Sequence, residues 1–216
     1  MDRNDSHTME ALVKRSALLG LTTLAVLLAA SAFAGSTPAA SRMILRASDL
    51  PPGFRVVRSE TGLETNDDLV RENGAALAPK LRRWGRVTGY RAFYRQRDPA
   101  RGALPGVIGF GAAVSLFRTA SGAHAALAAP GGGCRHRDFT LIGLGGNRPV
   151  GPDTLVCTRG LKVRRGRLRF FLVQWRNGRA AGAVYVLTAE GAVTPLAALT
   201  GARKQNRRMT AQLSNG

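Results

Sequence analysis

The chain contains few cysteines, few lysines and few acidic residues for its length. Its 216 residues include two Cys and 13 Asp or Glu, and only four of its 32 basic residues are Lys. Two cysteines exclude a disulfide-dense miniprotein and a zinc ribbon that needs four cysteines. A wholly disordered chain is also excluded, because 44% of the residues are hydrophobic. The composition therefore indicates a globular domain of ordinary size.

The formal net charge of +19 is carried almost entirely by arginine. Arg, Ala and Gly are all abundant and share GC-rich codons, so genome composition accounts for part of the basicity. Proteins selected for phosphate binding usually mix Lys with Arg, because both neutralise phosphate. The charge therefore leaves two interpretations open: a compositional bias and a selected polyanion-binding surface.

An export signal is predicted at the N-terminus, over residues 1–34. Lys14 and Arg15 precede an uncharged apolar run, Ser16–Ala34, whose last three residues have the small-x-small pattern of a cleavage site. An uncleaved membrane anchor is the alternative, since 19 helical residues span roughly 28 Å. Both interpretations place the rest of the chain outside the cytoplasm, either secreted or held at the membrane.

The processed chain is predicted to contain a tether and one domain. Residues 35–47 are rich in Ser, Ala, Thr and Pro and are predicted to form a short flexible tether. Residues 48–216 are predicted to form a single domain, because about 180 residues suffice to bury a core of ordinary size. No second apolar run approaches membrane length, so no membrane span is expected after cleavage.

Hydrophobic periodicity predicts the order strand, helix, two strands, helix, three strands, helix. Gly74 and Pro79 are expected to kink or split the first helix, and Asn177-Gly178 signals a tight hairpin. The fold class is therefore predicted as α+β, with an antiparallel sheet of about five to six strands and three helices packed mainly on one face. Strands are expected at 54–57, 87–97, 107–117, 154–163, 167–176 and 179–188, and helices at 67–84, 120–128 and 195–212.

The strand predicted at 107–117 has one face made of small residues. Gly109, Gly111, Ala113 and Ser115 alternate with large apolar side chains. A helix or another chain is expected to lie close against this small-residue face.

Cys134 and Cys157 are predicted to form a disulfide, which is the default for two thiols in an exported protein. Closing a loop of about 22 residues stabilises a fold by roughly 3 kcal/mol. A zinc ion held by Cys134, His136 and Cys157 is an alternative that lacks a fourth ligand, and a cysteine nucleophile with a histidine partner is another. Pairing of the two cysteines removes both alternatives, so no metal, no other cofactor and no catalytic residue is predicted.

Two basic clusters are candidates for binding a polyanion. One lies at the tip of a predicted hairpin and the other lies on the final helix. Together they would attract anionic cell-wall polymers, anionic lipid or nucleic acid. Solvated strand edges and a solvated helix face are the alternative interpretation. The candidates are Lys162, Arg164, Arg165, Arg167 and Arg169 in the first cluster, and Arg203, Lys204, Arg207 and Arg208 in the second.

Three short segments resemble a loose group of exported proteins from high-GC Gram-positive bacteria. They are Ser48-Asp49-Leu50-Pro51-Pro52-Gly53-Phe54, Val114-Ser115-Leu116-Phe117 with the nearby Ala123-His124-Ala125-Ala126, and Phe171-Leu172-Val173-Gln174-Trp175-Arg176-Asn177-Gly178. The layout is similar to extracytoplasmic sensor-type domains of mycobacterial serine/threonine kinases and related envelope lipoproteins. This resemblance implies an α+β domain with a cleft, often pinned by a disulfide and without established catalysis. The chain lacks a lipobox and a kinase portion, so anchoring and signalling are not carried over.

Three functional hypotheses follow from these patterns. The leading one is a secreted, non-enzymatic cell-envelope domain that binds a ligand or an envelope protein, with a cleft between the sheet and the helix at 66–84. The second is a basic adhesive domain that binds an anionic polymer through the arginine clusters. The third is a secreted hydrolase, although the chain has no G-x-S-x-G, H-E-x-x-H or Walker motif.

Overall fold

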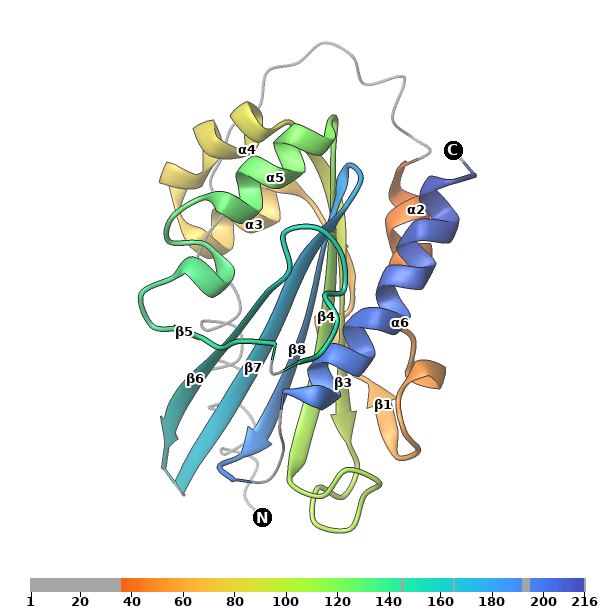
Figure 1. Cartoon of the computed structure of the whole chain (residues 1–216), viewed down its shortest axis with the longest axis vertical. Helices are drawn as coiled ribbons and strands as arrows, with labels where there is room; N and C mark the ends of the chain where they lie inside the picture. The colour runs from red at the N-terminus through yellow and green to blue at the C-terminus, as the bar shows by residue number, and fades with distance from the viewer. Residues whose placement is uncertain (1–35, 145, 165, 192–194, 216) are drawn as a thin grey trace.

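An antiparallel sheet of eight strands runs through the protein, and helices pack on both of its faces (Figure 1). The structure is a computed structural model that describes residues 36–144, 146–164, 166–191 and 195–215. The predicted signal peptide, residues 1–34, lies outside the described residues. None of the described helices is both long enough and apolar enough to cross a membrane.

The strands follow one another across the sheet in the order β1-β3-β4-β8-β7-β6-β5, with β2 pairing with β3. Their bounds are β1 Phe54–Val56, β2 Gly62–Glu64, β3 Arg86–Gln96, β4 Val107–Phe117, β5 Thr140–Leu141, β6 Leu155–Val163, β7 Gly166–Asn177 and β8 Ala180–Ala189. The predicted Asn177-Gly178 hairpin joins β7 to β8. Gly178 has a φ of 53°, a left-handed conformation that favours glycine.

Local sequence signals explain where several helices begin and end. The Thr65 side chain accepts a hydrogen bond from the backbone N–H of Asp68 and caps α3, and Thr119 caps α5 in the same way. Gly74 ends α3 and Pro79 lies in the first turn of α4, so the predicted split of the 67–84 helix is confirmed. The helices are α2 Ser36–Met43, α3 Asn66–Asn73, α4 Ala78–Trp84, α5 Ala120–Ala128 and α6 Leu196–Leu213, with 3₁₀ turns η1 Ala47–Asp49, η2 Arg58–Glu60, η3 Ala75–Leu77 and η4 Gly133–Arg135.

Side chains alternate between two differently covered faces of the sheet. On the face called the core face below, α2 and α6 pack over the largest apolar cluster, which includes Trp175 and Val184. The other side is called the opposite face. There α3, α4 and α5 cover the upper part in the view of Figure 1, and their apolar side chains gather around Phe117.

The fold class is confirmed as α+β, but the predicted numbers of elements were wrong. The described residues contain eight strands and five helices rather than five to six strands and three helices, and the helices lie on both faces. Strands β2 and β5 have three and two residues, which is too short for an alternating pattern to identify them.

The tether predicted over residues 35–47 is a second correction. From Ser36 onward this segment forms α2 and η1, and Ala40, Met43 and Leu45 are at most 2% exposed. The backbone N–H of Leu45 donates to Gln205 Oε1 of α6 at 3.1 Å, and the Leu45 carbonyl accepts from the Tyr94 hydroxyl. The helix is therefore held by tertiary packing, which its small-residue composition did not reveal.

Candidate functional site

The lower part of the opposite face carries an apolar cluster built from strands and the disulfide loop. Its members come from β4, β6, β7, β8 and the segment around Cys134, and within the described residues no side chain of α2–α6 belongs to it. Phe93 of β3 adjoins the cluster by stacking on Tyr185. Six of these residues are called the apolar floor below, and five of them are at most 7% exposed while Tyr185 is half-buried. The six are Phe93, Leu161, Phe170, Leu172, Tyr185 and Leu187.

Four aromatic rings form a continuous row across this region. The ring centroids of Phe93 and Tyr185 are 6.2 Å apart, and those of Tyr185 and Phe170 are 4.9 Å apart, both in stacked geometry. Phe139, from the loop before β5, meets Phe170 edge-on at 5.7 Å. Stacked and edge-on pairs of this kind stabilise a cluster beyond the area that they bury.

Two glycines on β4 make this row possible. Strand β4 lies between β3 and β8 and presents Gly109 and Gly111 at this level. A Cβ on Gly109 would lie 2.6 Å from the Phe93 ring, and a Cβ on Gly111 would lie 1.8 Å from the Tyr185 ring. The small-residue face predicted for 107–117 is therefore filled by rings from the neighbouring strands, and the upper part of the same face is covered by α5.

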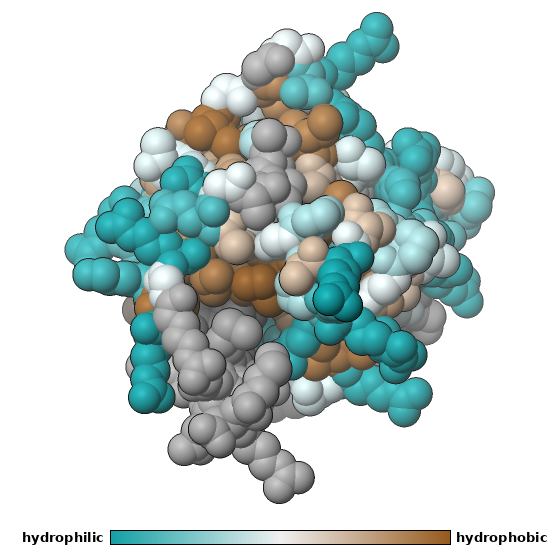
Figure 2. All heavy atoms as spheres, turned by 90° about the horizontal axis from the view of Figure 1, so that it is seen from below, coloured by the Kyte–Doolittle hydropathy of each residue, from teal (hydrophilic) through white to brown (hydrophobic). Residues whose placement is uncertain are grey.

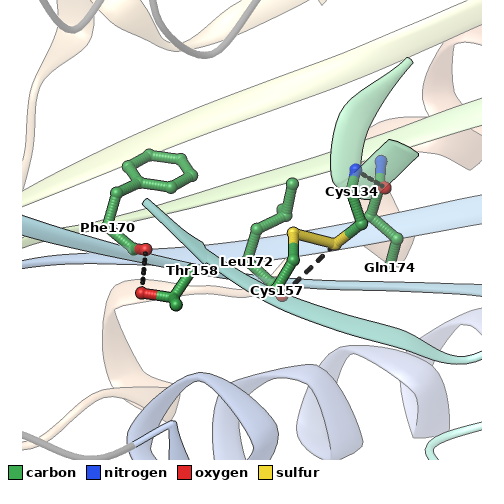
Figure 3. Close-up of a disulfide and its surroundings, with 6 residues drawn as sticks. All are labelled: Cys134, Cys157, Thr158, Phe170, Leu172 and Gln174. Atoms are coloured by element: carbon green, nitrogen blue, oxygen red, sulfur yellow. Dashed lines mark hydrogen bonds between the residues drawn. A yellow bond between two sulfur atoms is a disulfide. The ribbon is translucent and has the colours of Figure 1, made fainter. Parts of the chain in front are cut away.

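The predicted disulfide between Cys134 and Cys157 is confirmed and closes one side of the floor (Figure 3). It joins η4 to β6 with a Cα–Cα distance of 5.4 Å. The backbone N–H of Cys134 donates to Gln174 Oε1 at 2.8 Å, which ties the same turn to β7. The bridge thus fixes the loop that brings Phe139 to Phe170.

Charged side chains border the floor on two sides. Arg159 of β6 lies 5.7 Å over the Phe139 ring, and its Nη1 is 3.7 Å from the Asp138 carboxylate. On the β3 side, Arg95 Nη2 is 4.0 Å from Glu60 Oε1. Tyr185 lies between these two charged borders. Burial raises the pKa of its hydroxyl, and nearby carboxylates raise that pKa further. Tyr185 is therefore a neutral phenol at physiological pH.

The space between the sheet and α3, where a cleft was predicted, is occupied by a buried ion-pair network. Arg86 Nη2 donates to Glu64 Oε2 at 2.8 Å, and the same guanidinium donates to Asn66 Oδ1 and Ser115 Oγ. Burial raises the pKa of Glu64 and lowers that of Arg86, and the attraction between them opposes both shifts. A Cβ on Gly89 would lie 2.3 Å from Arg86 Nη2. The candidate site is therefore the apolar floor, lower on the opposite face, and not the space between α3 and the sheet.

The structure separates the two predicted basic clusters (Figure 1). The hairpin cluster lies at the lower end of β6 and β7, whereas the C-terminal half of α6 lies toward the upper end of the molecule. Lys162 and Arg167 are cross-strand partners and both are exposed, as is Arg164. Arg169 Nη2 is 3.3 Å from Glu190 Oε1. Arg165 lies outside the described residues.

Three of the four basic residues on α6 bind other described segments of the chain. Arg208 holds the Asp49 carboxylate with two hydrogen bonds of 2.9 and 3.0 Å, and Lys204 donates to the Asp49 carbonyl. Arg203 Nη2 donates at 2.9 Å to a backbone carbonyl in the loop before β6. Arg207 is exposed. These hydrogen bonds anchor η1 and that loop to α6.

Both described histidines are paired with an aspartate. His124 Nδ1 is 2.9 Å from Asp153 Oδ2, which also accepts a 2.6 Å hydrogen bond from Arg176 Nε. The hydrogen bonds from Arg176 and His124 hold the pKa of Asp153 below its usual value. His136 Nδ1 accepts a hydrogen bond from the backbone N–H of Asp138. Over the described ranges, no group of three His, Cys, Asp or Glu side chains is placed to hold a metal ion.

No protein-family model and no curated protein sequence matches the chain. A solved structure does match in fold: the extracellular domain of PknH from Mycobacterium tuberculosis, with a TM-score of 0.50 and 11% sequence identity. The match covers 83% of this chain and 97% of the PknH domain. At this identity the likeness concerns the architecture alone. It supports, at that level, the resemblance to extracytoplasmic domains of mycobacterial kinases, and this chain is therefore similar in fold to a bacterial extracellular domain.

Proposed function

We propose that the protein is a secreted, non-enzymatic domain of the cell envelope that binds a ligand or an envelope protein. One observation carries the proposal: the fold is similar, over 83% of this chain, to that of the extracellular domain of PknH. The apolar floor itself is packed, because five of its six side chains are at most 7% exposed.

The chemistry around the floor favours binding over catalysis. Both thiols are consumed by the Cys134–Cys157 bridge, so neither serves as a nucleophile. Tyr185 is neutral, and the imidazole of His136 accepts from its own loop. The stacked rings and leucines of the floor supply no acid, base or nucleophile.

Three features support a location outside the cytoplasm. The chain begins with a predicted export signal, its two cysteines are bridged, and its fold is similar to that of an extracellular domain. Disulfides persist mainly in oxidising compartments.

The proposal is tested by export and by an activity screen. The full chain is expressed in an exporting host, and intact-mass analysis of the recovered protein should show a chain that begins near Gly35 and carries the Cys134–Cys157 bridge. Recovery of the protein in the cytoplasm alone, with free thiols, would contradict the proposed location. Hydrolysis of an ester, peptide or glycan substrate that is lost in His136→Ala would contradict the non-enzymatic role.

The second candidate function is adhesion to an anionic polymer through the β6–β7 hairpin. Lys162 and Arg167 stand directly opposite each other at the hairpin end, and like charges in that position destabilise a sheet. Glu190 Oε2, 4.0 Å from Arg167 Nη1, offsets part of this repulsion, and an anionic polymer laid across the pair would relieve the rest.

A further inference from the structure

We infer that the protein docks on an anionic membrane surface through the end of the sheet that lies uppermost in Figure 1. This inference goes beyond the proposed function, because it concerns how the domain meets a membrane and not which ligand it binds. The surface consists of four exposed arginines, which we call the upper arginines: Arg82, Arg83, Arg118 and Arg179.

Backbone hydrogen bonds bring the upper arginines together from three separate parts of the chain. At this end of the sheet β3 begins, β4 ends and the β7–β8 hairpin turns (Figure 1). The backbone N–H of Gly85 donates to the Arg82 carbonyl at 2.9 Å, and the N–H of Arg118 donates to the Gly85 carbonyl at 2.9 Å. The N–H of Phe117, the residue before Arg118, donates to the Arg179 carbonyl at 2.9 Å. A continuous series of contacts therefore joins Arg82 to Arg179.

Gly85 lets the Arg118 side chain lie close to the end of α4. Its φ of 65° is a left-handed conformation that favours glycine and ends the helix. A Cβ on Gly85 would lie 3.5 Å from Arg118 Cβ and 3.6 Å from Arg118 Cδ, so the aliphatic part of Arg118 packs over this turn. The Arg118 side chain therefore lies at the turn that directly follows Arg82 and Arg83.

The positive charge of the upper arginines is not balanced within the described part of the chain. None of the four forms an ion pair with another described residue. The dipole of α4 favours Arg82 and Arg83 in its last turn, but Arg118 and Arg179 lie outside helices. An anionic partner would therefore be attracted to this end of the protein.

The carboxylates of the adjoining segment from β2 to α3 do not supply that partner. Three of them hold other arginines, in the pairs Glu64–Arg86, Asp68–Arg71 and Glu72–Arg91. Asp67, in the first turn of α3, is the exposed carboxylate that remains in this segment. One carboxylate leaves most of the charge of four arginines uncompensated.

The start of α2 indicates which anionic partner meets this end. Helix α2 begins at Ser36, at the upper end of the molecule in Figure 1, and the apolar run of the predicted export signal ends two residues earlier, at Ala34. Two residues span at most about 7 Å. When that run lies in a membrane, during export or as a retained anchor, the upper end of the domain therefore faces the lipid head groups. An arginine close to an anionic membrane strengthens binding roughly fivefold.

The lower end of the molecule carries a competing positive surface. The hairpin cluster lies there, with Lys162 and Arg167 opposite each other on β6 and β7. In the view from below, hydrophilic side chains, coloured teal, project around the margin of the molecule (Figure 2). Attraction by net charge alone would let either end meet a membrane, so the test compares the two ends.

The experiment measures how the protein recovered from the exporting host sediments with lipid vesicles at physiological ionic strength. The variant Arg118→Gln/Arg179→Gln removes two upper arginines. Its matched control is Lys162→Gln/Arg167→Gln, which removes the same charge from the lower end. All four residues are exposed, so neither variant disturbs the core.

We expect the wild type to bind vesicles that contain phosphatidylglycerol and not vesicles of phosphatidylcholine alone. Loss of two arginines at about fivefold each should weaken binding of Arg118→Gln/Arg179→Gln about 25-fold. The control should bind within about threefold of the wild type. Higher salt should weaken binding of the wild type and the control, because the attraction is electrostatic.

Three results would overturn the inference. The first is a folded wild-type protein that does not bind the phosphatidylglycerol vesicles. The second is an equal or larger loss of binding in the control, which would attribute binding to net charge or to the lower end. The third is retention on heparin that depends on Arg118 and Arg179 without binding to vesicles, which would identify an anionic polymer as the partner. None of these results would change the proposed function, which the mass analysis and the activity screen test separately.

Discussion

The phenol ring of Tyr185 lies against the backbone of Gly111, where a Cβ would be 1.8 Å from the ring. The two residues are cross-strand partners between β8 and β4, and Phe93 is the partner of Gly111 on the other side. The glycine therefore lets rings from two strands approach each other across a third. Glycine weakens a strand interior, so its presence here reflects the close approach that it permits.

Substitution of Gly111 tests this relationship. Gly111→Ala should displace the Tyr185 ring and lower the free energy of unfolding by about 1–3 kcal/mol, because the added methyl overpacks the contact. Gly160→Ala is the control, since a Cβ on Gly160 of β6 meets nothing within 4 Å. Urea unfolding measures both, and the double variant Gly111→Ala/Tyr185→Ala should lose less stability than the sum of the losses of its two single variants. Equal effects of the two glycine substitutions would contradict the argument.

The Arg86–Glu64 pair offers a second prediction. Arg86 is 4% exposed and Glu64 is 7% exposed, so Arg86→Gln would leave the buried carboxylate with only the half-exposed Arg91, 3.6 Å away, as its cation. We expect a loss of about 3–5 kcal/mol in the free energy of unfolding. Arg71→Gln, which removes an exposed partner of Asp68, should cost about 1 kcal/mol or less. A difference below about 1 kcal/mol between the two variants would show that the buried pair is not needed for stability.

Local signals in the sequence predicted most of the long elements. Alternation identified the strand at 107–117, Thr65 and Thr119 act as the caps that their positions indicate, and Asn177-Gly178 forms its hairpin. These features depend on residues close together in the chain. The disulfide was also predictable, because two cysteines in a chain that is predicted to be exported leave one pairing.

Features that depend on distant residues were not predicted. The segment that follows α2 is held at Leu45 by Gln205, which is 160 residues away in the chain, and Arg208 binds Asp49 across 159 residues. The aromatic row needs β4 between β3 and β8, and no local pattern specifies that order. The available signal for the aromatic row was the pair Gly109 and Gly111 on one face of a predicted strand, next to a predicted strand that carries Phe93.

Reduction of the disulfide gives a third prediction. Opening the loop closed by Cys134 and Cys157 should lower the free energy of unfolding by about 3 kcal/mol. Urea unfolding with and without dithiothreitol measures this effect, and the double variant Cys134→Ser/Cys157→Ser should not respond to the reductant. An unchanged wild-type midpoint on reduction would refute the stabilising role.

Two matched substitutions separate the effect of the hairpin cluster on polyanion binding from the effect of net charge. Arg167→Glu and Arg207→Glu change the charge equally, and both residues are exposed. If the hairpin binds a polyanion, Arg167→Glu should elute from heparin at lower salt than Arg207→Glu. The slope of log affinity against log salt should also be shallower by about 1, because Arg167 no longer neutralises an anionic group of the polymer. Identical elution of the two variants would attribute retention to net charge alone.

Acid stability should depend on Asp153, which lies between Arg176 and His124. The hydrogen bonds from Arg176 and His124 lower the pKa of Asp153 in the folded protein, so its stabilising effect is complete above the unfolded-state pKa, about 3.9, and is lost as pH falls through the folded-state value. Asp153 has a φ of 58°, which asparagine also tolerates, so Asp153→Asn removes the charge without adding backbone strain. In urea unfolding the variant should be less stable than the wild type at pH 6, and the difference should shrink toward pH 3.

Asp49 contributes to acid sensitivity in both the wild type and Asp153→Asn, so its effect must be separated from that of Asp153. Desolvation by burial would raise the pKa of Asp49, but the hydrogen bonds from Arg208 and the Arg46 backbone outweigh it, so the pKa of Asp49 is also lowered. The wild type and Asp153→Asn therefore both lose stability in acid, and only the difference between them reports on Asp153. A difference that stays constant from pH 6 to pH 3 would mean that the Asp153 carboxylate does not stabilise the fold through its charge.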